Sequence, residues 1–377
     1  MNYKLSDICN YGRDKIDSSS LTSSTYISTE NMLPNLGGVT LASSMPTISS
    51  VSRFKNGDIL LSNIRPYFQK MIFADFDGGC SNDVLVLRAD EKCILPEYLY
   101  YSLAHKNFFD YVTKTGKGTK MPRGDKAAIM KYEINVPEVY IQQKIIKILS
   151  SIDKKIKNNN RTNDNLHEMC LTIYRDLINK ADAEKDLLKN HAKCVLGGTP
   201  SRAKPEYWNG NINWINSGEI NRFRILEPSE TITDLGLKKT STTLLPIGTT
   251  VLAITGATLG QVSRLEIESC ANQSVIGVIP DDSLTNEFVY LNILENINDI
   301  IGRQTGGAQQ HINKNDVETY EIIIPEPEKI AKFDKEIKPI FGQIRNNCLE
   351  NERLTKLRDT LLPELLNGKI DISNIDI

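Results

Sequence analysis

Several common sequence signatures are missing from this chain of 377 residues, and each absence argues against a class of protein. The seven cysteines are scattered and odd in number, and none forms a Cys-x-x-Cys pair, so neither a disulfide framework nor a zinc site is indicated. No apolar run approaches the roughly 18–20 residues that span a membrane. The first residues also lack the apolar segment of a signal peptide. We therefore expect a cytoplasmic protein.

Catalytic signatures are equally scarce. The four histidines show no His-Glu-x-x-His spacing, which argues against a metal site. The glycine-rich stretch 256–260 lacks the Lys-Ser/Thr that completes a P-loop, so nucleotide binding is not indicated. Neither a Gly-x-Ser-x-Gly motif nor an Asn-Pro-Pro-Tyr or Asp-Pro-Pro-Tyr motif is present. We therefore predict that the chain has no catalytic centre and holds no metal or cofactor of its own.

What the chain does contain is an internal repeat, in which six short segments recur in the same order about 190 residues later. One pair is Gly57-Asp58-Ile59-Leu60-Leu61 and Gly248-Thr249-Thr250-Val251-Leu252. Another is Tyr132-Glu133-Ile134-Asn135-Val136-Pro137 and Tyr320-Glu321-Ile322-Ile323-Ile324-Pro325. Two copies of this length are too few for a solenoid, so they indicate a duplicated domain with a pseudo-two-fold relation.

Each copy has the pattern of an α+β domain. Short apolar runs predict buried strands at 58–61, 84–87, 250–254 and 275–280. Helices are predicted near 96–111 and 286–301, followed in each copy by a polar, glycine-containing loop and a strand that ends in proline. The predicted boundaries are a first α+β domain at 1–137, a central long helix at 138–184, a second α+β domain at 185–325 and a C-terminal long helix at 326–377.

The stretch after each of these prolines predicts a long helix, because its apolar residues recur mainly every three or four positions. At 1.5 Å per residue, a helix of about 40 residues is roughly 60 Å long and can act as a spacer. Pro339 predicts a kink or a break in the second helix. Asn367-Gly368 predicts its C-terminal stop.

Four asparagines bear on how the two helices pair. Asn159 and Asn163 in the first helix match Asn347 and Asn351 in the second. If they lie in the apolar seam, they select one register and orientation at some loss of stability. We interpret them as marking the middle of an antiparallel coiled coil. The alternative is that they lie just off the seam, in water.

Taken together, these features resemble the specificity subunit of type I restriction-modification enzymes. The residues that carry the resemblance are Gly57–Ser62, Thr305–Asn313, the strand–Pro–helix junctions 134–138 and 322–326, and Leu361–Gly368. The resemblance covers essentially the whole chain, in the order that the family uses. It implies two target-recognition domains, separated by the two long antiparallel helices, each reading one part of a split DNA site. Duplex DNA presents two half-sites to a two-fold protein in this way.

The resemblance also implies partners. The paired helices would set the gap between the half-sites and dock two methyltransferase subunits, and two restriction subunits with translocase activity could join that complex. Adenine methylation and DNA cleavage would belong to those partners. S-adenosylmethionine, ATP and Mg²⁺ are therefore expected in the partner subunits and not in this chain.

A basic loop in the first copy is the leading candidate for a DNA contact, although the net charge of −2 does not by itself indicate a nucleic-acid binder. Residues 114–126 hold five cations against the single acid Asp125. We predict DNA contacts from Lys117, Lys120, Arg123 and Lys126, with Arg123 suited to a guanine edge. The alternative is an ordinary solvated loop. Asn63 and Arg65 follow a strand, and Arg65 either contacts DNA or pairs with Asp75 or Asp77.

The second copy has polar candidates in the corresponding places. Its loop is less basic and rich in amides, which can bond to the major-groove edge of adenine. The predicted contacts are Gln304, Gly306, Gly307, Gln309, Gln310 and Asn313. Asn216 and Ser217 are added because they follow Trp208 and Trp214, of which at least one is expected in the core. The alternative for these residues is a polar loop without contacts.

Two other functions remain open on the sequence alone. The first is a two-lobed protein-binding scaffold with a coiled-coil spacer. The second is an enzyme, such as a nuclease with an unrecognised site made of scattered acids.

Overall fold

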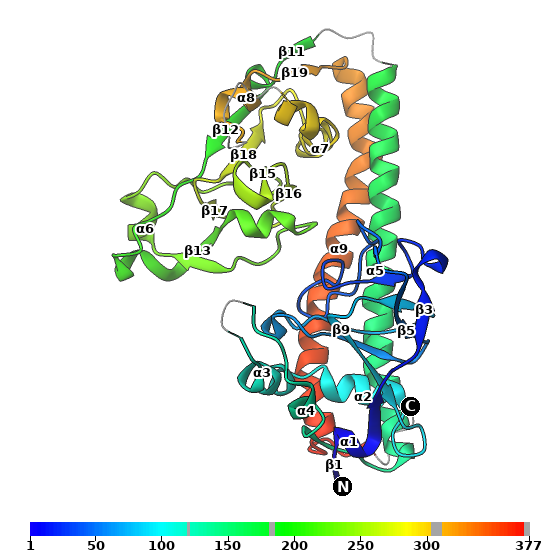
Figure 1. Ribbon diagram of the computed structural model, residues 1–377. Coiled ribbons are helices and arrows are strands. Elements are labelled where there is room, and N and C mark those ends of the chain that lie inside the picture. Colours follow the sequence, from blue (N-terminus) through cyan, green and yellow to red (C-terminus); the bar gives the residue numbers. More distant parts are fainter. Residues whose placement is uncertain (119–120, 181–184, 303–310, 373–377) are drawn as a thin grey trace. The chain divides into compact units, whose positions relative to one another are not determined.

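The computed structural model describes residues 1–118, 121–180, 185–302 and 311–372. The chain divides into two compact units (Figure 1). We call them lobe 1, which comprises Met1–Lys154 and Leu354–Ile377, and lobe 2, which comprises Lys155–Arg353. The long helices α5 (Val139–Asn179) and α9 (Pro327–Leu366) contribute a segment to each lobe. No described helix is long and apolar enough to cross a membrane.

Lobe 1 contains two four-stranded sheets, with strand orders β2-β9-β6-β7 and β3-β5-β8-β4, and the two-stranded pair β1-β10. Its strands are β1 (Asn2–Lys4), β2 (Cys9–Tyr11), β3 (Lys15–Asp17), β4 (Tyr26–Ile27), β5 (Ser50–Phe54), β6 (Ile59–Ser62), β7 (Met71–Phe73), β8 (Gly78–Cys80), β9 (Val84–Ala89) and β10 (Glu133–Asn135). Its shorter helices are α1 (Leu5–Ile8), α2 (Pro96–Leu103), α3 (Lys106–Thr115) and α4 (Lys126–Ile129).

The core of lobe 1 explains why β6 reads as a continuous apolar run. All four residues of this strand are buried, because β6 lies inside its sheet and both of its faces are covered. On one face Leu61 packs in the same cluster as Phe108 of α3, Ile145 of α5 and Leu362 of α9. The paired helices are therefore part of the core of the lobe and not an appendage to it.

Lobe 2 contains a four-stranded sheet of order β12-β18-β15-β16, a three-stranded sheet of order β14-β13-β17 and the pair β11-β19. Its strands are β11 (Lys185–Leu187), β12 (Ala192–Leu196), β13 (Trp208–Ile215), β14 (Glu230–Ile232), β15 (Thr250–Ala253), β16 (Val262–Arg264), β17 (Cys270–Ala271), β18 (Val275–Pro280) and β19 (Glu321–Ile323). Its shorter helices are α6 (Asp234–Lys238), α7 (Asn286–Gly302) and α8 (Lys314–Glu318).

The two lobes share the topology of their main sheet, as the internal repeat predicts, whereas their second sheets differ in the number and order of strands. The sheet β2-β9-β6-β7 corresponds strand for strand to β12-β18-β15-β16. A parallel pair recurs as well, with Tyr26 opposite Gly79 in lobe 1 and Trp214 opposite Cys270 in lobe 2. Gly57 and Gly248 both have positive φ, 91° and 92°, in the turn that enters the central strand, where glycine is the residue without strain. The predicted α+β class is confirmed.

The course of α9 bears on two predictions, the C-terminal stop at Asn367-Gly368 and the effect of Pro339. The stop at Asn367-Gly368 is confirmed, since α9 ends at Leu366, Gly368 has φ 68° and its N–H donates to the carbonyl of Leu365. Of the kink or break predicted at Pro339, the break is wrong, because α9 continues through this residue. Phe333, Ile337 and Phe341 on either side are buried in the core of lobe 2. Their packing offsets the roughly 3 kcal/mol that an internal proline costs.

Candidate nucleic-acid interface

The basic loop of lobe 1 is a closed hairpin. Lys117 and Arg123 exchange both backbone hydrogen bonds, at 2.8 and 2.9 Å, and Gly118 adopts φ 95° in the turn that follows Lys117. A second bridge joins Ile64 to Arg123, and the N–H of Gly124 donates to the carbonyl of Asn63 at 3.1 Å. The loop is therefore attached to the segment that follows β6, which gives it a rigid base.

The cations of this loop are exposed but have carboxylate partners. Lys117 Nζ lies 2.6 Å from Asp125, and Arg123 lies 3.0 Å from Asp83, a residue distant in sequence that directly precedes β9. The Lys117 ammonium and two backbone N–H groups hold the pKa of Asp125 below its ordinary value, so this pair is charged at neutral pH. Because the two cationic side chains are 82% and 55% exposed, such pairs contribute at most about 1 kcal/mol and can exchange for phosphate.

The other lobe 1 candidates differ in their exposure. Lys126 is exposed, and Lys120 lies outside the described residues. Arg65 is exposed, and of its alternative partners Asp75 and Asp77, Asp77 pairs with Arg53 at 3.3 Å. A direct DNA contact from Asn63 does not fit the structure. This side chain is 8% exposed, and its amide oxygen is buried below Gly124, where a Cβ atom would lie 2.9 Å away. Asn63 supports the loop from beneath.

The corresponding loop of lobe 2 is attached next to the C-terminal end of β15, the strand equivalent to β6. Thr255 bridges to His311, and the N–H of Ile312 donates to the carbonyl of Ile254 at 3.0 Å. Asn313 is the N-cap of α8 and accepts from the N–H of Asp316, so its carbonyl oxygen has a structural role, although the side chain is exposed. The other candidates of this loop lie outside the described residues: Gln304, Gly306, Gly307, Gln309 and Gln310.

The segment after Trp214 is held within lobe 2. Asn216 caps a short 3-10 helix by accepting from the N–H of Gly218, and its amide donates to Ser229, so both ends of the side chain are used. Ser217 is half-buried beside it. These contacts argue for a structural role of Asn216. Trp208 and Trp214 are both buried and meet edge to face at 5.0 Å between ring centroids, so the expectation that at least one lies in the core is confirmed.

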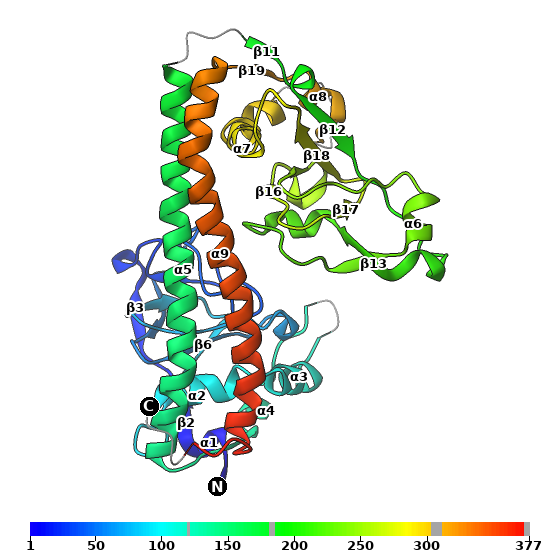
Figure 2. The same ribbon diagram turned by 180° about the vertical axis from the view of Figure 1, so that it is seen from behind.

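The four asparagines of the helices meet one another inside lobe 2. Asn347 donates to Asn163 at 2.8 Å, and Asn159 donates to Asn351 at 2.9 Å. The two contacts run in opposite directions along the chain, which is the antiparallel arrangement that Figures 1 and 2 show for α5 and α9. Asn159, Asn163 and Asn347 are 5%, 2% and 7% exposed, so they lie in the seam and not in water.

A buried charge cluster in lobe 2 had no signal in the sequence. Glu266, which follows β16, is 1% exposed and lies 2.6 Å from Arg264, 3.6 Å from Arg224 and 3.2 Å from Arg345 of α9. The side chain of Arg224 is fully buried and lies over the ring of Phe341. The cluster joins the sheet of lobe 2 to its own segment of α9. Only the folded chain brings Arg224 and Arg345 to Glu266, because both arginines are distant from it in sequence.

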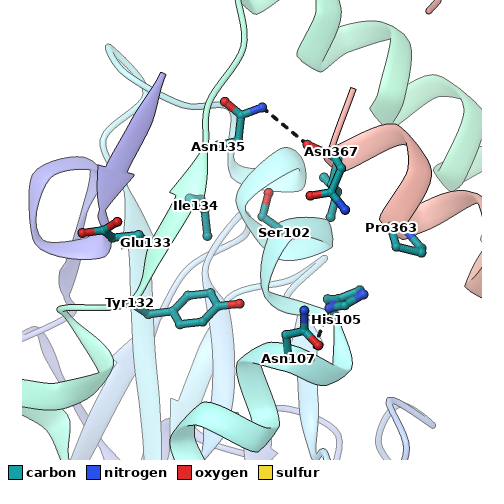
Figure 3. A pocket seen from close by; sticks show the side chains of 10 residues that line it. Ser102, His105, Asn107, Tyr132, Glu133, Ile134, Asn135, Pro363 and Asn367 are labelled. Carbon is teal, nitrogen blue, oxygen red and sulfur yellow. Dashed lines mark hydrogen bonds between the residues drawn. The ribbon is translucent and has the colours of Figure 1, made fainter. Parts of the chain in front are cut away.

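A cavity of about 120 Å³ in lobe 1 lies where β10 approaches the C-terminal end of α9 (Figure 3). Asn135 donates to the carbonyl of Leu366 across its rim. Two lining residues, Ser102 and His105, are the types found in hydrolases. The hydroxyl of Ser102 donates to the carbonyl of Tyr98, and Nδ1 of His105 accepts from the N–H of Asn107. Burial also lowers the pKa of His105. The lining residues therefore contain no nucleophile activated by a base.

The part of the chain that the structure describes contains no group of three or more His, Cys, Asp or Glu residues able to hold a metal ion. The features that stand out are instead duplicated. Each of the two α+β lobes has the same main sheet, with a polar loop attached to the end of its central strand. This architecture defines a two-lobed recognition protein.

Comparison with known proteins identifies the family. The profile described as "Type I restriction modification DNA specificity domain" matches residues 1–168 and 191–359, one match in each repeat. The chain belongs to this family. The resemblance found in the motifs is thus confirmed, and with it the role of a DNA-specificity subunit that is not itself catalytic.

Individual relatives agree with this assignment. The chain is 24% identical to the specificity subunit of the type I restriction enzyme HindI of Haemophilus influenzae, over 98% of this chain and 99% of that protein. It is 25% identical to the MjaIX specificity subunit of Methanocaldococcus jannaschii, over 75% and 71% of the two chains. The crystal structure of the type I restriction-modification S subunit from M. genitalium has the same fold, with a TM-score of 0.59 at 15% identity over 99% and 96% of the chains.

Proposed function

We propose that each lobe reads one part of a split, non-palindromic DNA site through the loop attached to its central strand. The observation that carries the proposal is the repeated attachment: Ile64 bridges to Arg123 in lobe 1, and Thr255 bridges to His311 in lobe 2. Equivalent positions on equivalent scaffolds, but with different side chains, suit a protein that reads two different half-sites.

Lobe 1 would bind its half-site with cations. Lys117, Lys126 and Arg123 are exposed, and the ion pairs of Lys117 and Arg123 are weak enough to be replaced by phosphate or base contacts. Lys120 belongs to the same loop and is included in the proposal. We assign phosphate contacts to the lysines. We assign base reading to Arg123, because a guanidinium can bond to both acceptors of a guanine edge.

Lobe 2 would rely on amides. The proposed contacts are Gln304, Gln309 and Gln310, with Gly306 and Gly307 allowing the backbone to approach DNA closely. Amide side chains pair with the adenine edge through two hydrogen bonds, whereas they do not neutralise phosphates. The binding constant of lobe 2 should therefore depend less on salt than that of lobe 1.

The chain would act inside a larger assembly. We propose that it docks two methyltransferase subunits and, where present, two restriction subunits, and that it works in the cytoplasm with the DNA. Support comes from the relatives, which are named as specificity subunits of type I restriction enzymes. S-adenosylmethionine, ATP and Mg²⁺ would then be bound by the partner subunits.

The test is a binding experiment on the chain assembled with its methyltransferase subunits. A duplex library is selected with this complex, and the affinity for the enriched site is measured at several salt concentrations. Lys117→Gln should weaken binding to all sequences and lower the slope of log K against log salt by about 0.9, the value for one phosphate contact. Arg123→Gln should instead relax the selectivity for one base pair, by about 1–3 kcal/mol.

Lys92→Gln is the matched control. Lys92 is exposed and follows β9 at its C-terminal end, whereas the basic loop is attached next to the N-terminal end of β9, through the antiparallel neighbour β6. This variant should leave both slope and selectivity unchanged. Equal behaviour of all three variants, or a wild-type complex that enriches no motif, would contradict the proposal. The second result would favour a protein-binding scaffold.

A further inference from the structure

The turn between β6 and β7 has an unusual backbone. It runs from Arg65 to Gln69 around a short 3-10 helix at Pro66–Phe68. Both ends are left-handed, with φ 48° at Arg65 and 52° at Gln69. This conformation is uncommon outside glycine, since the Cβ atom crowds the backbone. Within the described part of the chain, five non-glycine residues have positive φ, and four of them lie in this turn or in the adjacent pair Asn35 and Leu36.

The second lobe builds the same turn without strain. The residues in the equivalent positions are Gly256, with φ 70°, and Gly260, with φ 81°. The hydrogen bond that closes the turn is also repeated, from the N–H of Ser62 to the carbonyl of Lys70 and from the N–H of Ala253 to the carbonyl of Gln261. The backbone path thus requires two left-handed residues in both lobes, and only lobe 2 uses glycine for them.

The two non-glycine residues with positive φ in lobe 1 indicate that their side chains have a function. Glycine would satisfy the backbone, as it does in lobe 2, so folding does not account for Arg65 and Gln69. Strained backbone that is retained in this way is typical of functional sites. Arg65 is exposed, and between the two strained residues Tyr67 and Phe68 are 49% and 39% exposed, with ring centroids 4.8 Å apart. Lobe 2 has Thr258 and Leu259 in place of the two aromatic residues.

The surroundings of the turn indicate what it meets. The N–H of Arg65 donates to the carbonyl of Pro122 at 2.8 Å, which ties the turn directly to the basic loop. On the other side the N–H of Asn35 donates to the carbonyl of Phe68 at 2.8 Å, so the aromatic pair is held in place and cannot fold back easily. Exposed aromatic rings beside exposed cations are the usual combination for contact with nucleic acid bases and sugars.

We propose that the strained turn Arg65–Gln69 is a specificity element of lobe 1, in which Arg65 contacts the duplex and Tyr67 and Phe68 pack against base edges and deoxyribose. Its glycine counterpart in lobe 2 lacks both the charge and the rings, so the two lobes read their half-sites by different chemistry. This inference rests on the proposed function, because it assumes that the basic loop of lobe 1 faces DNA.

The decisive variant copies the glycines of lobe 2 into lobe 1. In the complex with methyltransferase subunits, Arg65→Gly with Gln69→Gly should raise the midpoint of thermal unfolding by about 2 °C, because the strain is relieved. The same variant should bind the enriched duplex about tenfold more weakly and lose sequence preference in one half-site only. A residue that merely supported the fold would give the opposite change in stability. Tyr67→Ala with Phe68→Ala should also weaken binding about tenfold while methyltransferase stays bound.

The control is Asn209→Gly, which removes a left-handed non-glycine residue, φ 61°, at an exposed position of β13 in lobe 2. It should leave the selected motif intact. Retention of the full motif and affinity by both turn variants would overturn the inference, as would a fall in the unfolding midpoint of the glycine variant. Loss of methyltransferase with DNA preference unchanged would assign the turn to a protein interface. A wild-type complex that enriches no motif would instead defeat the proposed function.

Discussion

The buried amide layer between α5 and α9 allows a sharp test of how the helices pair. Asn347 donates to Asn163 at 2.8 Å, and Asn163 donates to the sulfur of Cys348 at 3.4 Å. Replacing Asn163 alone by Leu leaves the amide N–H group of Asn347 buried without this acceptor. A buried donor without a partner costs about 1–3 kcal/mol, so we expect the single variant to be destabilised by about 2 kcal/mol.

The double variant should behave differently. In Asn163→Leu with Asn347→Leu both members of the pair are gone, so no amide from this pair is stranded. Replacement of both partners by apolar groups of similar shape is nearly neutral or stabilising. The two substitutions should therefore be strongly non-additive, with a coupling energy of about 2 kcal/mol or more. The Asn159–Asn351 contact remains in this variant, at 2.9 Å, and should preserve the antiparallel register.

The assay measures the free energy of unfolding of the wild type, the two single variants and the double variant by chemical denaturation. The four values are combined in a double-mutant cycle. Helix register is measured in parallel by disulfide trapping between cysteines placed at facing positions of α5 and α9. Additive destabilisation, with the double variant near 4 kcal/mol, would refute the reasoning, because it would mean that the two amides contribute independently. If the double variant kept its stability but formed trapping disulfides in several helix registers, the main role of the amide layer would be to select one register.

Three further predictions concern the lobes themselves. Burial lowers the pKa of His167 to about 4, so its ring is neutral in the native state but takes up a proton below about pH 6.5 when unfolded. The free energy of unfolding of lobe 2 should therefore fall as pH decreases from 6.5 towards 4, by at most about 3 kcal/mol and by less after solvent screening. His167→Gln should flatten this part of a plot of unfolding free energy against pH. Glu266→Gln should destabilise lobe 2 by about 3–5 kcal/mol in urea unfolding, because it removes the counter-charge that Glu266 gives the fully buried Arg224. A loss of stability below 1 kcal/mol would contradict this prediction. Gly197→Ala should abolish soluble expression or folding, because the new Cβ would lie 2.2 Å from the carbonyl oxygen of Asn272, and normal circular dichroism of that variant would disprove it.

The duplication, the α+β class and the long helices could all be predicted from the amino-acid sequence. These features depend on local patterns that any fold must respect: apolar runs bounded by glycine and proline for the strands, and a three-and-four spacing for the helices. The same spacing brought the four asparagines close to the seam but left open whether they lie in it. The burial of Asn159, Asn163 and Asn347 in the folded chain shows that these three do. The motifs at Gly57 and Gly248 were informative for a related reason, since a turn with positive φ has a strong residue preference.

Which polar side chains are available for binding could be seen only in the folded chain. Asn63, Asn216 and Asn313 have the same chemistry in the sequence, but one is buried beneath a loop and two cap helices, whereas Arg65 remains exposed. The two caps are local contacts, over two residues from Asn216 to Gly218 and over three from Asn313 to Asp316. The burial of Asn63 instead depends on packing between distant segments, which no local pattern records. The charge cluster around Glu266 and the strained turn at Arg65–Gln69 have the same origin. Their energies arise from burial and from a backbone path imposed by neighbouring loops, so they exist only in the folded chain.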